Sequence, residues 1–306
     1  MTESALAPQA STQDESKRLA RRHKALERIF GAKFVKTFAS PYMVIEDHVI
    51  LSPVAVRFYK KDFEYLSKQL YLEYQYRSWK GFNSELLQRY AEITSIKLAN
   101  IKVLMTNTIN RLRKLLDQQG YKEDLTLWPA AFKDDVPIIA AHARSYIDML
   151  KMLDDVNTLA GTANLMGVID STQRAEAEYI CKKAVRAFRS ILQTEVAKLY
   201  REAERIIREQ HSSGQVDQAM ADTVAQQGKD IAAFDKSTEE EEHGDVGMDL
   251  KGADPSQVID DAAATSTAAA AAAAGRKRDS RAKGESEAAS RAGEPAASPA
   301  AAVAAG

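Results

Sequence analysis

Apolar residues recur at helical spacing over most of the chain between residues 53 and 210. The repeats run from Tyr59 to Tyr74, from Leu86 to Leu115, from Ile139 to Leu153 and from Ala184 to Ile206. A step of three or four residues places such side chains along one stripe of a helix. The pattern therefore predicts four long helices. The second has more than thirty residues, a length suited to a helical hairpin or a dimer seam.

Capping residues indicate where these helices begin and end. Ser52 followed by Pro53, Asn83 or Ser84, and Asp170 or Ser171 can each open a helix. The expected ends are Trp79–Gly81, Gly120, and Gly161 or Gly167. Residues 121–137 are expected to form a loop, with Pro137 opening the third helix.

One segment has a different period. Residues Tyr42–Leu51, YMVIEDHVIL, are rich in β-branched and aromatic residues and lie between two Ser-Pro pairs, which predicts a strand. A strand followed by two helices suggests a ribbon-helix-helix-like module, in which paired strands of two subunits enter the major groove of DNA. The alternative is a small sheet that covers one end of a helical core. Neither strand face is basic, since alternation places Glu46 on one side and Asp47 on the other.

The expected fold is mostly α, a long-helix bundle with a minor β-strand element and a disordered C-terminal tail. We predict a disordered leader at 1–16, a helical body at 17–210 and an acidic, alanine-rich, disordered tail at 211–306. No apolar run approaches the ~20 residues needed to span a membrane. The N-terminus lacks the pattern of a signal peptide, and the single cysteine, Cys181, fits a reducing compartment. A cytoplasmic protein is therefore expected.

The net charge of −1 hides two opposite parts of the chain. Residues 17–209 hold 33 Lys and Arg against 23 Asp and Glu, whereas residues 210–306 hold 9 against 17. The excess is strongest in residues 17–37, called the basic arm below, with eight basic residues and one acid. A weak apolar stripe predicts a helix there that stops near Gly31. The candidate nucleic-acid-binding residues are Lys17, Arg18, Arg21, Arg22, Lys24, Arg28, Lys33 and Lys36. Cations in such a row bind phosphates and release counterions.

The sequence offers little support for catalysis, metal binding or a cofactor. The five histidines are scattered, and Cys181 lies in the middle of a predicted helix, away from the helix N-terminus that would activate a thiol. No phosphate loop, nucleophile elbow or dinucleotide motif is present. An enzyme would need a site assembled from distant residues, such as Asp134, Asp135, His142 and Asp154. We expect no catalytic residue, no metal ligand and no cofactor.

Two blocks of sequence resemble a known family. They are VAVRFYKKDFEYLSKQLYLEY, after the strand, and SYIDMLKMLDDVNTLAGTANLMGVIDSTQRAEAEYICKKAVRAFRSI, in which Asp170, Arg174 and Ala175 begin a basic helix. Over about residues 38–200 the chain resembles the AcaB-like transcriptional regulators of integrative conjugative elements and conjugative plasmids, formerly a domain of unknown function. The resemblance implies a non-enzymatic, ribbon-helix-helix-like DNA-binding regulator, with duplex DNA, a second copy or conjugation-element proteins as partners. The alternative is a helical scaffold of the conjugation machinery. The acidic strand departs from a DNA-reading ribbon.

The acidic tail generates the first prediction. Glu239–Glu242 are expected to compete with DNA for the basic arm, because such contacts between flexible, oppositely charged segments are sensitive to salt. Deletion of residues 211–306 should then tighten binding of a labelled duplex at low salt. An unchanged affinity would reject masking by the tail.

Overall fold

The computed structural model describes residues 10–121, 128–214, 217–242, 257, 259–261 and 263–267, and it is mostly helical. Its elements, in order, are α1 (Ala10–Phe30), α2 (Ala32–Thr37), β1 (Met43–Ile50), α3 (Pro53–Arg77), α4 (Ser84–Gln118), β2 (Phe132–Ile138), α5 (Ala141–Leu165), α6 (Ser171–Ser213) and α7 (Gln218–Glu242).

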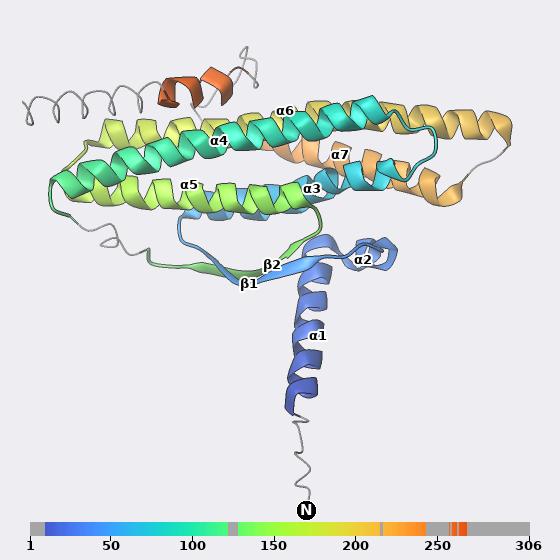
Figure 1. Cartoon of the computed structure of the whole chain (residues 1–306), viewed down its shortest axis with the longest axis horizontal. Coiled ribbons are helices and arrows are strands. Elements are labelled where there is room, and N and C mark those ends of the chain that lie inside the picture. Colours follow the sequence, from blue (N-terminus) through green and yellow to red (C-terminus); the bar gives the residue numbers. More distant parts are fainter. Residues whose placement is uncertain are drawn as a thin grey trace, which may run out of the picture.

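The long helices lie alongside one another as an elongated bundle (Figure 1). Helix α4 packs against α5 and α6, and α3 packs against α5. The core between them is apolar, with Leu66, Ile101, Leu150 and Val196 fully buried. The two strands lie along one side of the bundle, and α1 projects outward beyond them (Figure 1). The predicted long-helix bundle with a minor strand element is confirmed.

The predicted capping residues hold the helix starts. Ser52 accepts a hydrogen bond from the backbone N–H of Ala55, and Asn83 accepts those of Glu85 and Leu86. Asp170 and Gln173 form a reciprocal capping box at the start of α6. These residues satisfy N–H groups that the first helical turn leaves without partners. The boundaries read from the sequence for α3, α4 and α6 are therefore confirmed at their N-termini.

The prediction for residues 121–137 was wrong in its second half. Residues 132–138 form β2, which pairs antiparallel with β1 of the same chain, and α5 begins at Ala141 instead of Pro137. Pro137 is tolerated because a two-stranded sheet has only edge strands, where one missing N–H need not break the ladder. Val136 and Ile138 are buried beneath the sheet. The partner of β1 is therefore a strand of the same chain. This agrees with a small sheet that covers the helical core and differs from a ribbon formed by strands of two subunits.

A β-bulge interrupts the ribbon formed by β1 and β2. The register shifts between Ile45, opposite Val136, and His48, opposite Asp134. Two residues of β1, Glu46 and Asp47, therefore stand opposite the single residue Asp135. Asp47 adopts a left-handed backbone conformation with φ of 55°. The simple alternation assumed from the sequence fails at this point.

Helix α7 corrects the proposed start of the tail at residue 211. The Phe234 ring stacks on Tyr65 of α3, with 3.7 Å between ring centroids, and Val224 is buried. Tyr76 also hydrogen-bonds Gln227. Deleting residues 211–306 would remove these core contacts, so masking by Glu239–Glu242 is better tested by Glu→Gln substitutions at these four positions in the full chain. The disordered leader predicted at 1–16 overlaps α1, which already begins at Ala10. Its residues 1–9, and most of the tail at 243–306, lie outside the described residues.

The start of α3 is fastened to α5 by a buried carboxylate. Asp154, whose side chain is 1% exposed, accepts hydrogen bonds from the backbone N–H groups of Leu51, at 3.1 Å, and Ser52, at 2.5 Å. Asn157, one turn further along α5, donates to the Ser52 hydroxyl at 3.2 Å. These contacts fix the point where the ribbon leads into the bundle.

This anchor generates a stability prediction. Asp154→Ala should lower the free energy of unfolding by about 2 kcal/mol, because two backbone N–H groups lose a charged acceptor. Asp155→Ala is the matched control, since its side chain is 39% exposed and pairs only with Lys151 among the described contacts; it should cost no more than about 0.5 kcal/mol. Urea denaturation measures both. Equal effects would show that Asp154 is not an anchor.

Candidate nucleic-acid interface

The basic arm comprises most of α1 together with α2, and apolar contacts attach it to the bundle near its middle. Leu26 and Phe30 are buried, and the Phe30 ring lies 6.4 Å from that of Phe63 in α3. Leu19, two turns before Leu26, is 60% exposed. Only the C-terminal part of α1 is therefore held by the core, and the part before it stands out from the body (Figure 1).

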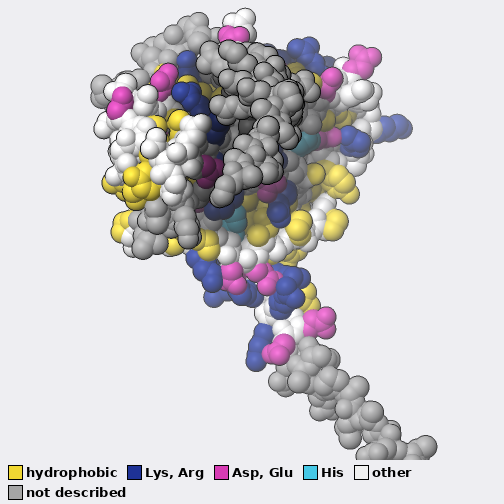
Figure 2. Space-filling model, turned by 60° about the vertical axis from the view of Figure 1, so that its left-hand side comes forward, with side chains coloured by type: hydrophobic (Ala, Val, Ile, Leu, Met, Phe, Trp, Pro, Cys, Tyr) yellow, Lys and Arg dark blue, Asp and Glu magenta, His cyan; other side chains and the backbone are white. Residues whose placement is uncertain are grey.

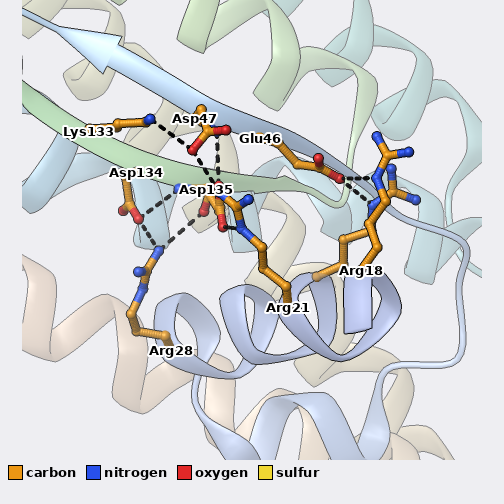
Figure 3. A network of polar contacts seen from close by, with 9 residues as sticks. Arg18, Arg21, Arg28, Glu46, Asp47, Lys133, Asp134 and Asp135 are labelled. Carbon is orange, nitrogen blue, oxygen red and sulfur yellow. Dashed lines mark hydrogen bonds and ion pairs between the residues drawn. The ribbon is translucent and has the colours of Figure 1, made fainter. Parts of the chain in front are cut away.

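Arginines of α1 contact the acidic side chains of the ribbon (Figure 3). Nε of Arg18 and Nε of Arg22 each lie 2.8 Å from the same Glu46 oxygen. Arg21 forms a two-pronged contact with Asp135, through Nε at 2.6 Å and Nη2 at 2.7 Å. The Arg21 contact uses the planar donor fork of the guanidinium group, which suits carboxylates, whereas Arg18 and Arg22 each give one N–H to Glu46.

Two further contacts extend this network. Nη2 of Arg21 also lies 2.7 Å from the Asp47 carboxylate, which accepts from Lys133 at 3.1 Å as well. Arg28 pairs with Asp134, which also accepts the hydroxyl of Tyr59 at 3.0 Å. Burial raises the pKa of Tyr59, and the adjacent Asp134 charge raises it further, so this hydroxyl stays a donor.

The β-bulge explains why one helix can reach acids that alternate in the sequence. In a regular strand Glu46 and Asp47 would point to opposite faces. In the bulged strand both carboxylates contact arginines of α1. The backbone N–H of Asp47 donates to Asp135 at 2.9 Å, which ties the bulge to the neighbouring strand. The backbone irregularity thus gathers the acids on the side that faces the arm.

The contacts favour the ionised form of both partners. Hydrogen bonds from Arg18 lower the pKa of Glu46, and those from Arg21 lower the pKa of Asp47 and of Asp135. The same bonds to Asp135 and Asp47 raise the pKa of Arg21. The network is therefore fully charged, near water and open to screening by salt.

The arm keeps donors at the surface even though its arginines are paired. The side chains of Arg18, Arg21 and Arg28 are 60%, 47% and 52% exposed. Figure 2 shows basic and acidic side chains gathered side by side where the projecting segment leaves the body. Each paired guanidinium therefore still presents part of its surface to solvent.

The four lysines of the arm differ from the arginines. Lys17, Lys24, Lys33 and Lys36 are exposed. Lys33 donates to Gln226 of α7 at 3.1 Å. Within the described part of the chain, Lys17, Lys24 and Lys36 make no ion pair. The structure thus brings Arg18, Arg21, Arg22 and Arg28 together on the ribbon and leaves these three lysines outside the network.

Sequence reasoning missed the ribbon carboxylates as partners of the arm. A signal was present, since two pairs of adjacent acids, Glu46-Asp47 and Asp134-Asp135, stand about ninety residues apart in the chain. They meet only because β1 pairs with β2, and the sequence pattern of residues 132–138 does not predict that pairing. The proposed competitor, Glu239–Glu242, has side chains outside the described residues, so masking by the tail stays a prediction.

The residues weighed for catalysis have structural contacts in the fold. Asp134 and Asp135 bind arm arginines, and Asp154 binds backbone N–H groups. Burial raises the pKa of Cys181 to about 12, which keeps the thiol protonated. Over the described residues, no three His, Cys, Asp or Glu side chains are grouped as metal ligands. No helix in that part of the chain is long and apolar enough to cross a membrane.

Comparison with known proteins gives one structural likeness. No family model and no curated protein matches the chain. The structure is similar to the crystal structure of selenomethionine-containing AcaB from uropathogenic E. coli, with a TM-score of 0.48 and 16% sequence identity, over 64% of this chain and 97% of that chain. A likeness of this size assigns no function.

The arm–ribbon network generates a prediction about pH. Arg21→Ala should raise the pKa of Asp135 toward its ordinary value of 3.8, measured by NMR titration of the carboxyl carbon, because the largest cause of the lowered pKa is removed. Lys24→Ala is the control on the same helix and should leave that titration in place.

The same pKa changes predict how the contact between the arm and the ribbon depends on pH. The pKa values of Glu46, Asp47 and Asp135 are lowered in the folded state. The contribution of their ion pairs to the stability of the folded state is therefore fully present above the ordinary carboxyl pKa. It is lost as the pH falls through the lowered values. If the pKa of Asp135 is the same in the Arg21→Ala variant as in the wild-type protein, the pairing of Asp135 with Arg21 is contradicted.

Proposed function

We propose that this protein is a non-enzymatic, DNA-associated regulator, acting in the cytoplasm, that holds the phosphate backbone of duplex DNA through its basic arm. One observation carries the proposal: the basic arm stands outside the helical core, with exposed lysines and half-exposed arginines along it. Phosphate contacts of this kind position a protein on DNA without reading its sequence.

The shape of the arm supports attachment to phosphates. Lys17 and Lys24 are seven residues apart on α1, so they share a helix face two turns apart. The adjacent arginines present donor forks that fit phosphate oxygens as well as carboxylates. A row of such cations gives binding that depends little on base sequence and strongly on salt.

The biological setting of the proposal comes from the sequence resemblance. Residues 38–200 resemble regulators carried by conjugative elements, which favours a role in the transfer of a mobile element. Base readout by the ribbon is not part of the proposal, since its four carboxylates face the arm and would repel phosphates. The proposal includes a homodimer, which would place two arms on one duplex. Light scattering tests for this dimer.

A second candidate is a helical scaffold of the conjugation machinery. Ile96 and Val103 favour it, because these apolar residues are 47% and 44% exposed and lie two turns apart on α4. Such a face can bind a protein partner. Recovery of secretion or relaxosome components in a pull-down, with no DNA retained after nuclease treatment, would favour the scaffold.

The proposed function generates a prediction about salt. Wild-type protein should bind unrelated duplexes with similar affinity, and the affinity should fall steeply between ~50 mM and ~200 mM salt. The double variant Lys17→Gln/Lys24→Gln should weaken binding to all duplexes alike. It should also reduce the slope of log affinity against log salt by about 1 for each phosphate that the arm no longer neutralises. Fluorescence anisotropy measures both quantities.

A matched control removes two exposed charges elsewhere. Lys80→Gln/Lys229→Gln changes the net charge by the same amount in a loop after α3 and in α7. It should leave the salt slope near the wild-type value. Absence of binding by the wild-type protein even at ~50 mM salt would contradict the proposed function.

A further inference from the structure

Every acidic residue of the ribbon contacts the basic arm. Strand β1 contains Glu46 and Asp47, and β2 contains Asp134 and Asp135. Each of these four carboxylates pairs with an arginine of α1. Four acids crowded on a two-stranded ribbon would repel one another, and the arm supplies the charges that offset this repulsion.

The ribbon uses the same donors that DNA would use. Arg21 gives both prongs of its fork to Asp135, and Arg18 and Arg22 share Glu46. A phosphate oxygen is recognised by the same N–H groups with the same planar geometry. The ribbon carboxylates and a DNA phosphate therefore cannot both have the full set of these hydrogen bonds.

We propose that the ribbon is a built-in competitor that occupies the arginines of the arm until a polyanion displaces its carboxylates. This inference rests on the proposed function and adds its regulation. DNA would take Arg18, Arg21 and Arg22 from Glu46, Asp47 and Asp135, while Leu26 and Phe30 keep the arm attached to the bundle.

The structure makes such an exchange feasible. Few apolar contacts hold the part of the arm that precedes Leu26. Leu19 is exposed, and Ala25 is the first buried residue of α1 among those described. Arg18 and Arg21 are 60% and 47% exposed, although their partners Glu46 and Asp135 are only 22% and 14% exposed. Ion pairs whose cation is open to water are individually of modest strength. Many closely spaced phosphates can therefore replace them, and the ribbon reduces DNA affinity without abolishing binding.

The test follows the carboxylates during DNA binding. Carboxyl-carbon NMR resonances of Glu46, Asp47 and Asp135 are recorded at neutral pH in the full chain, with and without a duplex. The triple variant Arg18→Ala/Arg21→Ala/Arg22→Ala gives their positions without arginine partners. Addition of DNA to the wild-type protein should move the three resonances toward those positions.

A ribbon variant provides a second measurement. Glu46→Gln/Asp47→Asn/Asp135→Asn should bind the duplex about tenfold more tightly at ~50 mM salt, because several weak pairs no longer compete. Asparagine is accepted at the left-handed position of Asp47. The control Glu64→Gln/Asp148→Asn/Asp155→Asn removes three carboxylates of the bundle instead and should give a smaller gain.

The outcomes separate the competitor from the proposed function. If DNA binds and the carboxyl resonances stay in place, the competitor is wrong and the proposed function stands. If the ribbon variant binds the duplex no more tightly than the wild-type protein does, the competitor is wrong as well. If neither binds DNA, the proposed function fails and the inference falls with it.

Discussion

The pairing of β1 with β2 is the interaction on which the arrangement of charge depends. It joins residues 43–50 to residues 132–138, with α3 and α4 between them in the chain. The pairing brings Glu46 and Asp47 beside Asp134 and Asp135, and the arm then lies against the acids so gathered. Asp154 secures the same unit to α5. A small sheet thus determines where a basic helix stands relative to a large helical bundle.

The parts of the fold that could be predicted are those with local causes. The stripes of α3 and α6, and the caps Ser52, Asn83 and Asp170, depend on residues near one another in sequence. Strand β1 could be predicted from its β-branched and aromatic residues. Strand β2, FKDDVPI, contains two acids and a proline and resembles a loop until β1 pairs with it. Its state is set by tertiary context, which outweighs strand propensity.

The candidate interface divides in the same way. The cations of the arm could be identified from composition, because eight basic residues and one acidic residue within residues 17–37 are a local property of the sequence. Their partners could not, since the acids lie in two strands and the bulge at Asp47 turns neighbouring carboxylates to one side. The sequence pointed to the tail as the acidic counterpart, because Glu239–Glu242 are consecutive acids. The structure has such a counterpart inside the folded body.

The length of α6 explains why α7 is part of the folded body, although the composition of this segment predicts a disordered tail. At 1.5 Å per residue, the 43 residues of α6 extend ~65 Å, whereas the 25 residues of α5 extend ~38 Å. The apolar stripe of α6 therefore continues past the end of its neighbour, through Leu199 and Ala203. Helix α7 turns back beneath this overhang (Figure 1). A mismatch in helix length thus recruits a weakly apolar segment into the core and moves the end of the folded body well past residue 210.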